Sequence, residues 1–344
     1  MMRQRLAIIM GEICILAFSA ACQTSADAGL LEELKSRGQG GLALIRVRSS
    51  LLMLLSFDGE IQSSQNPRDD SIASFSGDGE TVVWINDTTP GDPLAACLFP
   101  VTVEAPERGK PWQLPGDVAY VRAMAVSSNG AEVAFDGTYK PEGASRNPSL
   151  WTVGLHYIDS SSNTMRLLLP LAAEQGPVTS ISFSPDGAQF VYDHSNRIFI
   201  FDVKDGSTHQ VAVGASPTWS PNGKWIAFRS SDGVATTLNA STLKVEALID
   251  KRRIQTSVHW SPDSRFVMFS EPLGLISGIA NWRYPFLPPT ARMIVERIED
   301  HAWASVYPLD PDGIIDDQGF YWVPDYRVFA TAAASPPSIR PCGK

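Results

Sequence analysis

Six stretches of the chain repeat one short phrase, and this repeat constrains the fold more than any other feature. Each copy has an apolar run that usually ends in an aromatic residue, a turn similar to Ser-Pro-Asp-Gly, and a second apolar run. The turns begin at intervals of 51, 57, 36, 41 and 62 residues, at Ser76, Ser127, Ser184, Ser220, Ser261 and Val323. A unit of roughly 40 residues that recurs with insertions indicates a repeat architecture.

The phrase predicts a β-hairpin. Pro at the second turn position presets φ, Asp or Asn follows it, and Gly adopts the positive φ that a side chain resists. Residues 225–228 and 266–269 alternate as strands do on either side of such a turn. Further strand-like runs follow in most copies, such as 197–203 with 208–213. Each unit therefore has the four strands of a propeller blade.

The copy at 219–228 resembles the TolB-type, WD-like propeller repeats of bacterial envelope proteins. It consists of a tryptophan, Ser-Pro-Asn-Gly, a lysine and a short apolar strand that ends in Phe228, and the resemblance covers about residues 41 to 333. It implies a propeller that serves as a docking surface at the outer membrane. Proteins of that family also carry an α/β domain before the propeller, which residues 23–40 are too short to supply.

The two ends of the chain are expected to meet in one blade. The sixth copy leaves too few residues after Ala334 for two more strands, and residues 41–48 and 51–61 have the pattern of the missing outer strands, with Asp58-Gly59 as their turn. We therefore predict an all-β, six-bladed β-propeller whose N- and C-terminal strands share the closing blade, which removes a free sheet edge. An open array or a seven-bladed ring with a cryptic first unit is the alternative.

The N-terminal residues have the pattern of a targeting segment. Arg3 and Arg5 precede an apolar stretch at 6–21 that ends in small residues before Cys22. This resembles a bacterial lipoprotein signal, in which Cys22 is lipidated; ordinary cleavage after Ala21, which leaves a thiol, is the alternative. We expect a signal peptide at 1–21, a tether at 22–40 and a single propeller domain at 41–344. The protein would be periplasmic or anchored at the outer membrane.

The acidic composition limits the class of partner. The chain has 37 Asp and Glu residues against 28 Lys and Arg, a formal net charge of −9. This balance argues against nucleic acid and against anionic membrane surfaces as partners. We expect a monomer that binds a protein or a cell-wall component and contacts a membrane only through its lipid anchor.

Cysteine usage agrees with export. Cys14 and Cys22 belong to the targeting segment, so Cys97 and Cys342 remain for the folded part. In an oxidising compartment this pair could form a disulfide where the first blade meets the C-terminal tail. Two unpaired thiols are the alternative.

The sequence contains no recognised catalytic motif. It has no Gly-x-Ser-x-Gly elbow, no Gly-rich phosphate loop and no His-Glu-x-x-His helix, and its five histidines are scattered over different repeats. Asp310, Asp312 and Asp316 cluster oxygens of the kind that calcium prefers, but they lack the spacing of the helical calcium loop. We interpret this run as a turn between blades and expect no cofactor.

One set of positions is predicted to face the centre of the ring. The residue before each core position of the innermost strands points to the opposite face. These residues are Ser74, Ala125, Ser182, Thr218, His259 and Tyr321. We predict His259 and Tyr321 as the polar rim of a channel, with Ser74, Ser182 and Thr218 as further ligand candidates; a hydrated lining without ligand is the alternative. A hydrolase or lyase with His259 and Tyr321 near the axis is the rival function.

A long insertion at 271–290 stands where a short turn should join two strands of the fifth unit. It holds Trp282, Arg283, Tyr284 and Phe286 among prolines. Aromatic and Arg side chains are enriched in the hot spots of protein interfaces, and long loops are often functional. A loop folded over its own blade is the alternative. The sequence thus favours an exported, envelope-anchored propeller that acts as a non-enzymatic binding scaffold.

Overall fold

The computed structural model of the chain is built almost entirely of antiparallel strands, with one helix among the described residues. It describes residues 28–36, 41–46, 51–55, 61–65, 71–77, 81–86, 97–98, 101–102, 112–113, 116–141, 151–159, 161–162, 164–171, 176–246, 248–249, 252–254, 257–272, 291–306 and 320–323. Within these ranges, no helix has the length and apolar character needed to cross a membrane.

The strands form five hydrogen-bonded sheets, whose bounds are as follows. The first contains β24 (Phe320–Val323), β1 (Gly41–Arg46), β2 (Leu51–Leu55) and β3 (Ile61–Gln65), in that order. The second contains β4 (Ser71–Phe75), β5 (Thr81–Asn86), β6 (Cys97–Leu98) and β8 (Trp112–Gln113), with β7 (Val101–Thr102) paired to β5. The third contains β9 (Gly116–Val126), β10 (Glu132–Pro141), β11 (Thr152–Asp159) and β12 (Thr164–Pro170).

The remaining two sheets come from the second half of the chain. A seven-stranded sheet contains β13 (Ile181–Phe183), β14 (Gln189–His194), β15 (Arg197–Asp202), β16 (Thr208–Trp219), β17 (Trp225–Ser230), β18 (Ala235–Asn239) and β19 (Val245–Glu246). The last contains β20 (His259–Trp260), β21 (Phe266–Pro272), β22 (Ala291–Arg297) and β23 (Trp303–Val306).

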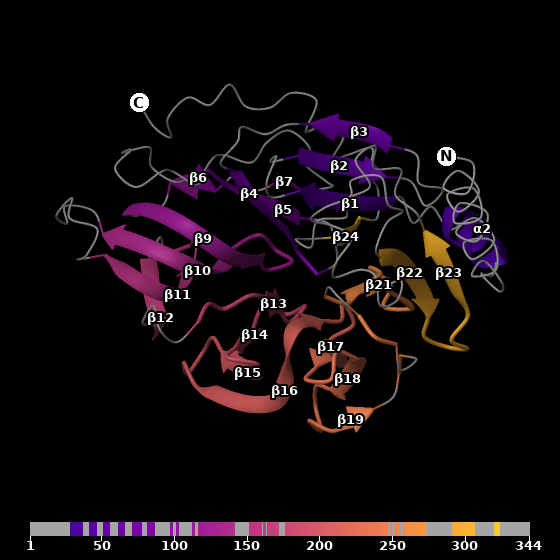
Figure 1. Ribbon diagram of the computed structural model, residues 1–344. Helices are drawn as coiled ribbons and strands as arrows, with labels where there is room; N and C mark the ends of the chain where they lie inside the picture. The colour runs from indigo at the N-terminus through magenta and orange to yellow at the C-terminus, as the bar shows by residue number, and fades with distance from the viewer. Residues whose placement is uncertain are drawn as a thin grey trace, which may run out of the picture.

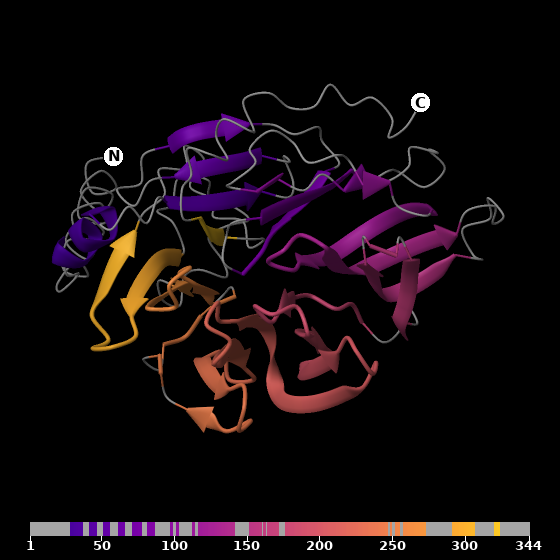
Figure 2. The ribbon, with the colours of Figure 1, turned by 180° about the vertical axis from the view of Figure 1, so that it is seen from behind.

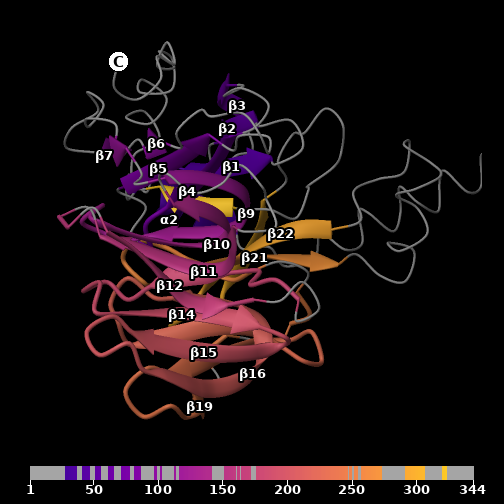
Figure 3. The same cartoon turned by 90° about the vertical axis from the view of Figure 1, so that its left-hand side faces the viewer.

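The sheets follow one another around a common centre in chain order (Figure 1). Figure 2 shows the same succession from behind, with β9 to β12 on the side opposite β22 and β23. In the view of Figure 3, β10, β11 and β12 lie above β14, β15 and β16, so that consecutive sheets form consecutive layers.

The strand β16 belongs to two hairpins. Its first half pairs with β15 up to Val213, and its second half pairs with β17 from Gly214 onward. The register of the second pairing is irregular between Ala215 and Thr218. One long strand therefore serves as the outer strand of one four-stranded group and the inner strand of the next.

The two ends of the described chain lie side by side in the first sheet. The strand β24 pairs with β1 in antiparallel register, with Gly41 opposite Val323 and Leu44 opposite Phe320. The rest of that sheet comes from the N-terminal hairpins β1–β2 and β2–β3.

The repeated turns owe their shape to one serine and one Asp or Asn. In four copies the serine Oγ accepts the backbone N–H five residues later at 2.9–3.0 Å and donates to the Asp or Asn side chain. These serines are Ser127, Ser184, Ser220 and Ser261, all buried. The fourth turn position has positive φ, and it is Gly in three copies and Ser264 in the other. These hydrogen bonds explain why Ser and Asp or Asn recur at the same turn positions along the chain.

Three of the outermost strands share an irregularity. One extra residue interrupts the register of β3 against β2, of β12 against β11 and of β16 against β15. The other described outermost strands are short: β8 and β19 have two residues each and β23 has four.

The core lies between the sheets and is lined by the aromatic residues that end the inner strands. Phe75, Phe183, Trp219, Trp260 and Trp322 are each at most 5% exposed, as the repeat predicted. The helix α2 (Ala28–Ser36) packs beside β23 (Figure 1). It lies within the segment that we expected to be a tether, and its Leu30 and Leu34 are fully buried.

Candidate functional site: the inner strands

The five polar positions predicted to face the centre all lie on the innermost strand of a sheet or strand group. Ser74 is on β4, Ser182 on β13, Thr218 on the second half of β16, His259 on β20 and Tyr321 on β24. Among the described strands, each of these segments pairs with a neighbour on one side only, so its other backbone edge needs partners from elsewhere.

Ser182 and Thr218 supply such partners from one sheet to the next. The Oγ of Ser182 accepts a hydrogen bond from the backbone N–H of Trp219 at 2.9 Å. The Oγ1 of Thr218 donates to the carbonyl oxygen of Val258 at 2.5 Å. Each side chain therefore satisfies a backbone group on the unpaired edge of the following inner strand. These contacts account for a polar residue at both positions without a ligand.

Two more hydrogen bonds join the same strands. The Nε1 of Trp260 donates to the carbonyl oxygen of Thr218 at 3.3 Å, and the Oγ of Ser180 donates to the carbonyl oxygen of Pro217 at 3.2 Å. The inner strands β13, β16 and β20 are thus linked in series. This arrangement favours a rigid centre, because the polar groups already form hydrogen bonds within the protein and are not left open for a substrate.

His259 is largely enclosed by protein, although the residue keeps some solvent exposure. Burial lowers the pKa of His259 to about 4, so the imidazole is neutral at neutral pH. A neutral imidazole of such low basicity is a weak general base. Tyr321 pairs through its backbone with Ala43 of β1. Whether His259 and Tyr321 contact a ligand stays a prediction.

The inner strands approach one another closely at the end that carries the repeated turns. A Cβ placed on Gly77, in the turn after β4, would lie 3.8 Å from the carbonyl oxygen of Trp219 at the end of β16. These two segments belong to sheets that do not follow each other in the chain. The centre is therefore narrow at this level, where Ser74 is 2% exposed.

Two buried carboxylates at the other end of the inner strands were not singled out from the sequence. Asp136 on β10 and Asp193 on β14 each follow the aromatic residue of the second strand, and each is at most 3% exposed. Asp136 accepts a hydrogen bond from the N–H of Val178, and Asp193 accepts one from the N–H of Ser216. Both carboxylates therefore join their own sheet or strand group to the next one. The shared sequence Phe/Tyr-Asp at this repeat position is the signal that would have found them.

Several predicted residues lie outside the part of the chain that the structure describes. They are Cys22, Trp282, Arg283, Tyr284, Phe286, Asp310, Asp312, Asp316 and Cys342. Cys97 begins β6, but its proposed disulfide partner is among these residues. Among the described residues, no three His, Cys, Asp or Glu side chains are grouped so that they could hold a metal ion.

No protein-family model matches the chain, and no curated protein matches its sequence. Among solved structures, TolB from Acinetobacter baumannii is similar with a TM-score of 0.50 and 16% identity, over 83% of this chain and 66% of TolB. A putative TolB from Agrobacterium tumefaciens aligns with a TM-score of 0.47 and 16% identity, over 78% of this chain and 88% of that chain. This chain spans slightly less than two thirds of the Acinetobacter protein. At 16% identity that likeness shows the fold alone, a β-propeller similar to that of TolB.

Proposed function

We propose that this chain is an exported six-bladed β-propeller, anchored to the cell envelope through Cys22, that binds a protein or a cell-wall component without catalysing a reaction. In this proposal residues 1–21 are a signal peptide, residues from 41 onward form the propeller, and both chain ends share the closing blade. The observation that carries the proposal is the TolB-like propeller fold together with inner strands whose Ser182 and Thr218 side chains bond to backbone groups of the next inner strand.

Two features of the topology support six blades. Dividing the seven-stranded sheet at β16 gives two four-stranded groups, which brings the number of blades to six. The antiparallel pairing of β24 with β1 supports closure of the ring by strands from both ends. A closed ring leaves no unpaired face between the first and last blades.

The inner-strand contacts support a binding scaffold over a channel enzyme. Ser182 and Thr218 are already engaged in hydrogen bonds between sheets, and the low pKa of His259 makes it a poor base. A partner would then be bound by loops at the rim, and the docking role implied by the sequence resemblance agrees with this. The strongest loop candidate in the sequence is the insertion at 271–290, with Trp282, Tyr284 and Phe286.

Replacing Trp282, Tyr284 and Phe286 together with Ala should weaken partner binding. Each true anchor residue contributes about 2 kcal/mol or more, so the affinity for the partner captured from an envelope fraction should fall at least 30-fold. The matched control is Leu243→Ala with Val245→Ala, which removes exposed apolar side chains from the β18–β19 hairpin of another blade. Affinity is measured by titration with the purified partner, and the melting temperature is measured for both variants.

The binding role of the insertion would be wrong if the triple variant bound normally and melted several degrees earlier, because the loop would then be a structural flap. A loss of affinity in the Leu243 and Val245 control of the same size would instead place the contact on the β18–β19 hairpin.

Lipidation of Cys22 is tested by fractionation. The wild-type protein should sediment with the membranes and Cys22→Ser should remain in the soluble fraction, because a diacyl-type anchor holds a protein stably where a thiol cannot. Gln23 follows the cysteine, so we expect the outer membrane as the site. A wild-type protein found only in soluble fractions would show that Cys22 is not lipidated.

A further inference from the structure

The helix α2 is held on the propeller by its buried face. Leu30 and Leu34 lie four residues apart on one side of the helix, and both are fully buried, whereas Glu32 is exposed. A nine-residue helix is too short to be stable alone in water, so α2 depends on this packing. Nine of the residues between Cys22 and the first strand are therefore docked on the propeller.

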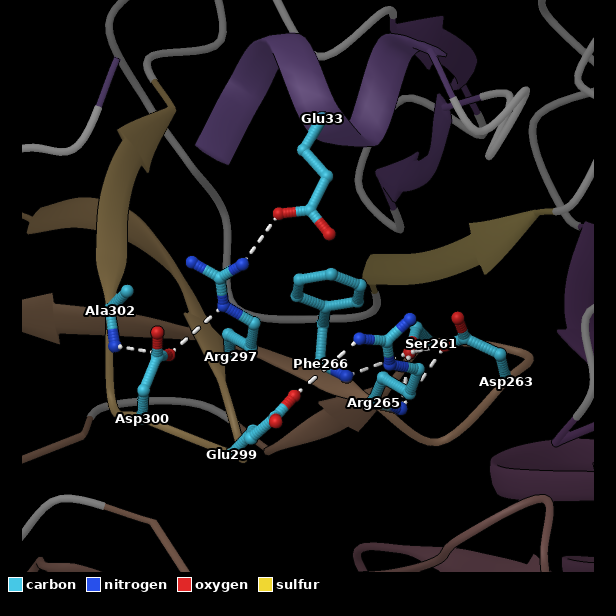
Figure 4. A network of polar contacts seen from close by, with 9 residues as sticks. All are labelled: Glu33, Ser261, Asp263, Arg265, Phe266, Arg297, Glu299, Asp300 and Ala302. Atoms are coloured by element: carbon cyan, nitrogen blue, oxygen red, sulfur yellow. Dashed lines mark hydrogen bonds and ion pairs between the residues drawn. The ribbon is translucent and has the colours of Figure 1, made fainter. Parts of the chain in front are cut away.

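An ion pair fixes α2 to the β22–β23 hairpin. The Oε2 of Glu33 lies 2.6 Å from the Nη1 of Arg297, and both side chains are largely shielded from water (Figure 4). The Nε of Arg297 also donates to the Oδ1 of Asp300 at 2.9 Å. The guanidinium is thus oriented from one side by its own hairpin and binds the helix from the other.

The hairpin that receives α2 is itself well ordered by hydrogen bonds. The N–H of Arg297 donates to the carbonyl oxygen of Ala302 at 2.8 Å, and the N–H of His301 donates to the carbonyl oxygen of Arg297 at 3.0 Å. The Oδ1 of Asp300 accepts the N–H of Ala302 at 3.1 Å. The seat for α2 is therefore a turn closed by its own hydrogen bonds.

The position of α2 limits how far the propeller can lie from an anchored Cys22. Only five residues separate Cys22 from Ala28, where the helix begins, and such a segment spans at most about 20 Å. A free linker from Cys22 to Gly41 would reach about three times as far. In Figures 1 and 2, α2 and β23 lie on the side of the molecule opposite β9 to β12.

We infer that α2 is an orienting brace, which holds the β22–β23 edge of the propeller toward a lipid bilayer and turns the β9–β12 sheet away from it. The inference rests on the proposed lipidation of Cys22. It adds that the anchored propeller does not tumble on a flexible tether, so that one side of the ring is presented to partners beyond the membrane.

The test uses the full-length lipidated protein, reconstituted into phosphatidylcholine vesicles that carry an acceptor dye on the lipid headgroup. A donor dye is attached through an azide-bearing amino acid at position 299 in the β22–β23 turn or at position 161 in the β11–β12 turn. Glu299 and Ser161 are both exposed, and the label leaves the native cysteines untouched. Energy transfer from position 299 should be at least threefold more efficient than transfer from position 161.

Releasing the helix should remove this difference. Leu30→Ser with Leu34→Ser exposes α2, so the two positions should give similar transfer, while hydrogen exchange of residues 30–34 becomes fast. Glu33→Gln should reduce the difference in part, because it removes the ion pair with Arg297. The melting temperature of each variant confirms that the propeller remains folded.

The possible outcomes test the orienting role of α2 separately from the lipidation of Cys22. Equal transfer from both positions in wild-type protein that floats with the vesicles would overturn the orienting role while leaving lipidation intact. Wild-type protein that does not float with the vesicles would refute lipidation of Cys22, and with it the brace. A large difference that survives in the Leu30 and Leu34 variant would assign orientation to another part of the chain.

Discussion

Two consecutive four-stranded groups, β9–β12 and β13–β16, each use a buried aspartate to bind the next group. They differ in the donors that surround its carboxylate. Both place a buried aspartate after the aromatic residue of the second strand, at Asp136 and Asp193. Asp136 forms an ion pair with Arg122, with Nε and Nη2 at 2.8 and 2.9 Å, and accepts one backbone N–H, from Val178. Burial nevertheless raises the pKa of Asp136, because desolvation outweighs the attraction of Arg122.

Asp193 is held by neutral donors only. It accepts the N–H groups of Thr179, Ser180 and Ser216 at 2.8–2.9 Å, and the hydroxyl of Thr179 at 2.6 Å. Three of these donors are backbone groups at the unpaired edges of two inner strands. The difference teaches that these two copies share the position of the carboxylate and the link that it makes between strand groups, while the neighbouring residues supply a cation to Asp136 and neutral donors to Asp193.

The same two groups also differ in one aromatic pair. In the first, Phe135 stacks on His156, with ring centroids 5.0 Å apart and an interplanar angle of 19°. In the second, Tyr192 stacks on Phe199 at 5.3 Å and the same angle. The strand registers place His156 and Phe199 at equivalent positions. His156 is fully buried and fills a site where the next strand group has the hydrocarbon ring of Phe199.

Removal of Asp193 should have the largest effect on stability. Asp193→Ala leaves three backbone N–H groups and a hydroxyl without their acceptor, so we expect a loss of about 3 kcal/mol in the free energy of unfolding. Asp136→Ala should cost about half as much, since Arg122 is 40% exposed and can return to water. Urea denaturation of both variants measures this. A larger loss for Asp136→Ala would show that the ion pair is the stronger link.

The stacked His156 and Phe199 can be exchanged by His156→Phe and Phe199→His. The loss of stability at low pH should follow the histidine from one strand group to the other. Burial lowers the pKa of His156 from 6.5 to about 4. Between these values the unfolded chain binds more protons than the folded chain, so stability falls as the pH falls through this window. His156→Phe should remove this loss and stabilise the protein by about 2 kcal/mol at about pH 5, with little effect near pH 7.

The reciprocal substitution is the control. Phe199→His should make the protein less stable at about pH 5 than at pH 7, although Phe199 is less buried than His156. Both variants are compared by urea denaturation at the two pH values. An unchanged pH dependence in His156→Phe would mean that the imidazole is not neutral in the folded protein.

The smallest effect is expected at the turn of the third sheet. Ser128 stands where Pro185, Pro221 and Pro262 stand in three other copies. Ser128→Pro should stabilise the protein by about 0.5 kcal/mol, because Pro restricts the unfolded chain at a position whose geometry it already adopts in the repeat. Thermal unfolding measures this small shift. Destabilisation would show that the β9–β10 turn departs from the shape of its counterparts.

The sequence allowed the turns, the paired strands around them and the buried aromatic residues to be predicted, because these depend on local chemistry that recurs. Gly187 and Gly223, for example, have the positive φ that the phrase requires. The pairing of β24 with β1 also agrees with the pattern of the chain ends. These features follow from short-range periodicity, which a single sequence displays directly.

The contacts between sheets were much harder to foresee. Nothing local distinguishes Ser182, which accepts from Trp219, from a serine that lines a channel, since the distinction depends on the rotation between neighbouring sheets. The docking of α2 was missed for the same reason: its partner Arg297 lies 264 residues away in the chain. Long-range pairs of this kind leave no periodic trace in one sequence.

The extra residues in β3, β12 and β16 bear on how copies of the protein behave when crowded. A bulged strand twists away from its neighbour and offers a broken row of backbone donors and acceptors, and strands of two residues offer hardly any. The outer edges of these sheets are therefore poor templates for a strand from another molecule. Copies of such a molecule can be concentrated without these sheet edges joining into fibres, so that any contact between molecules falls to side chains instead of backbone.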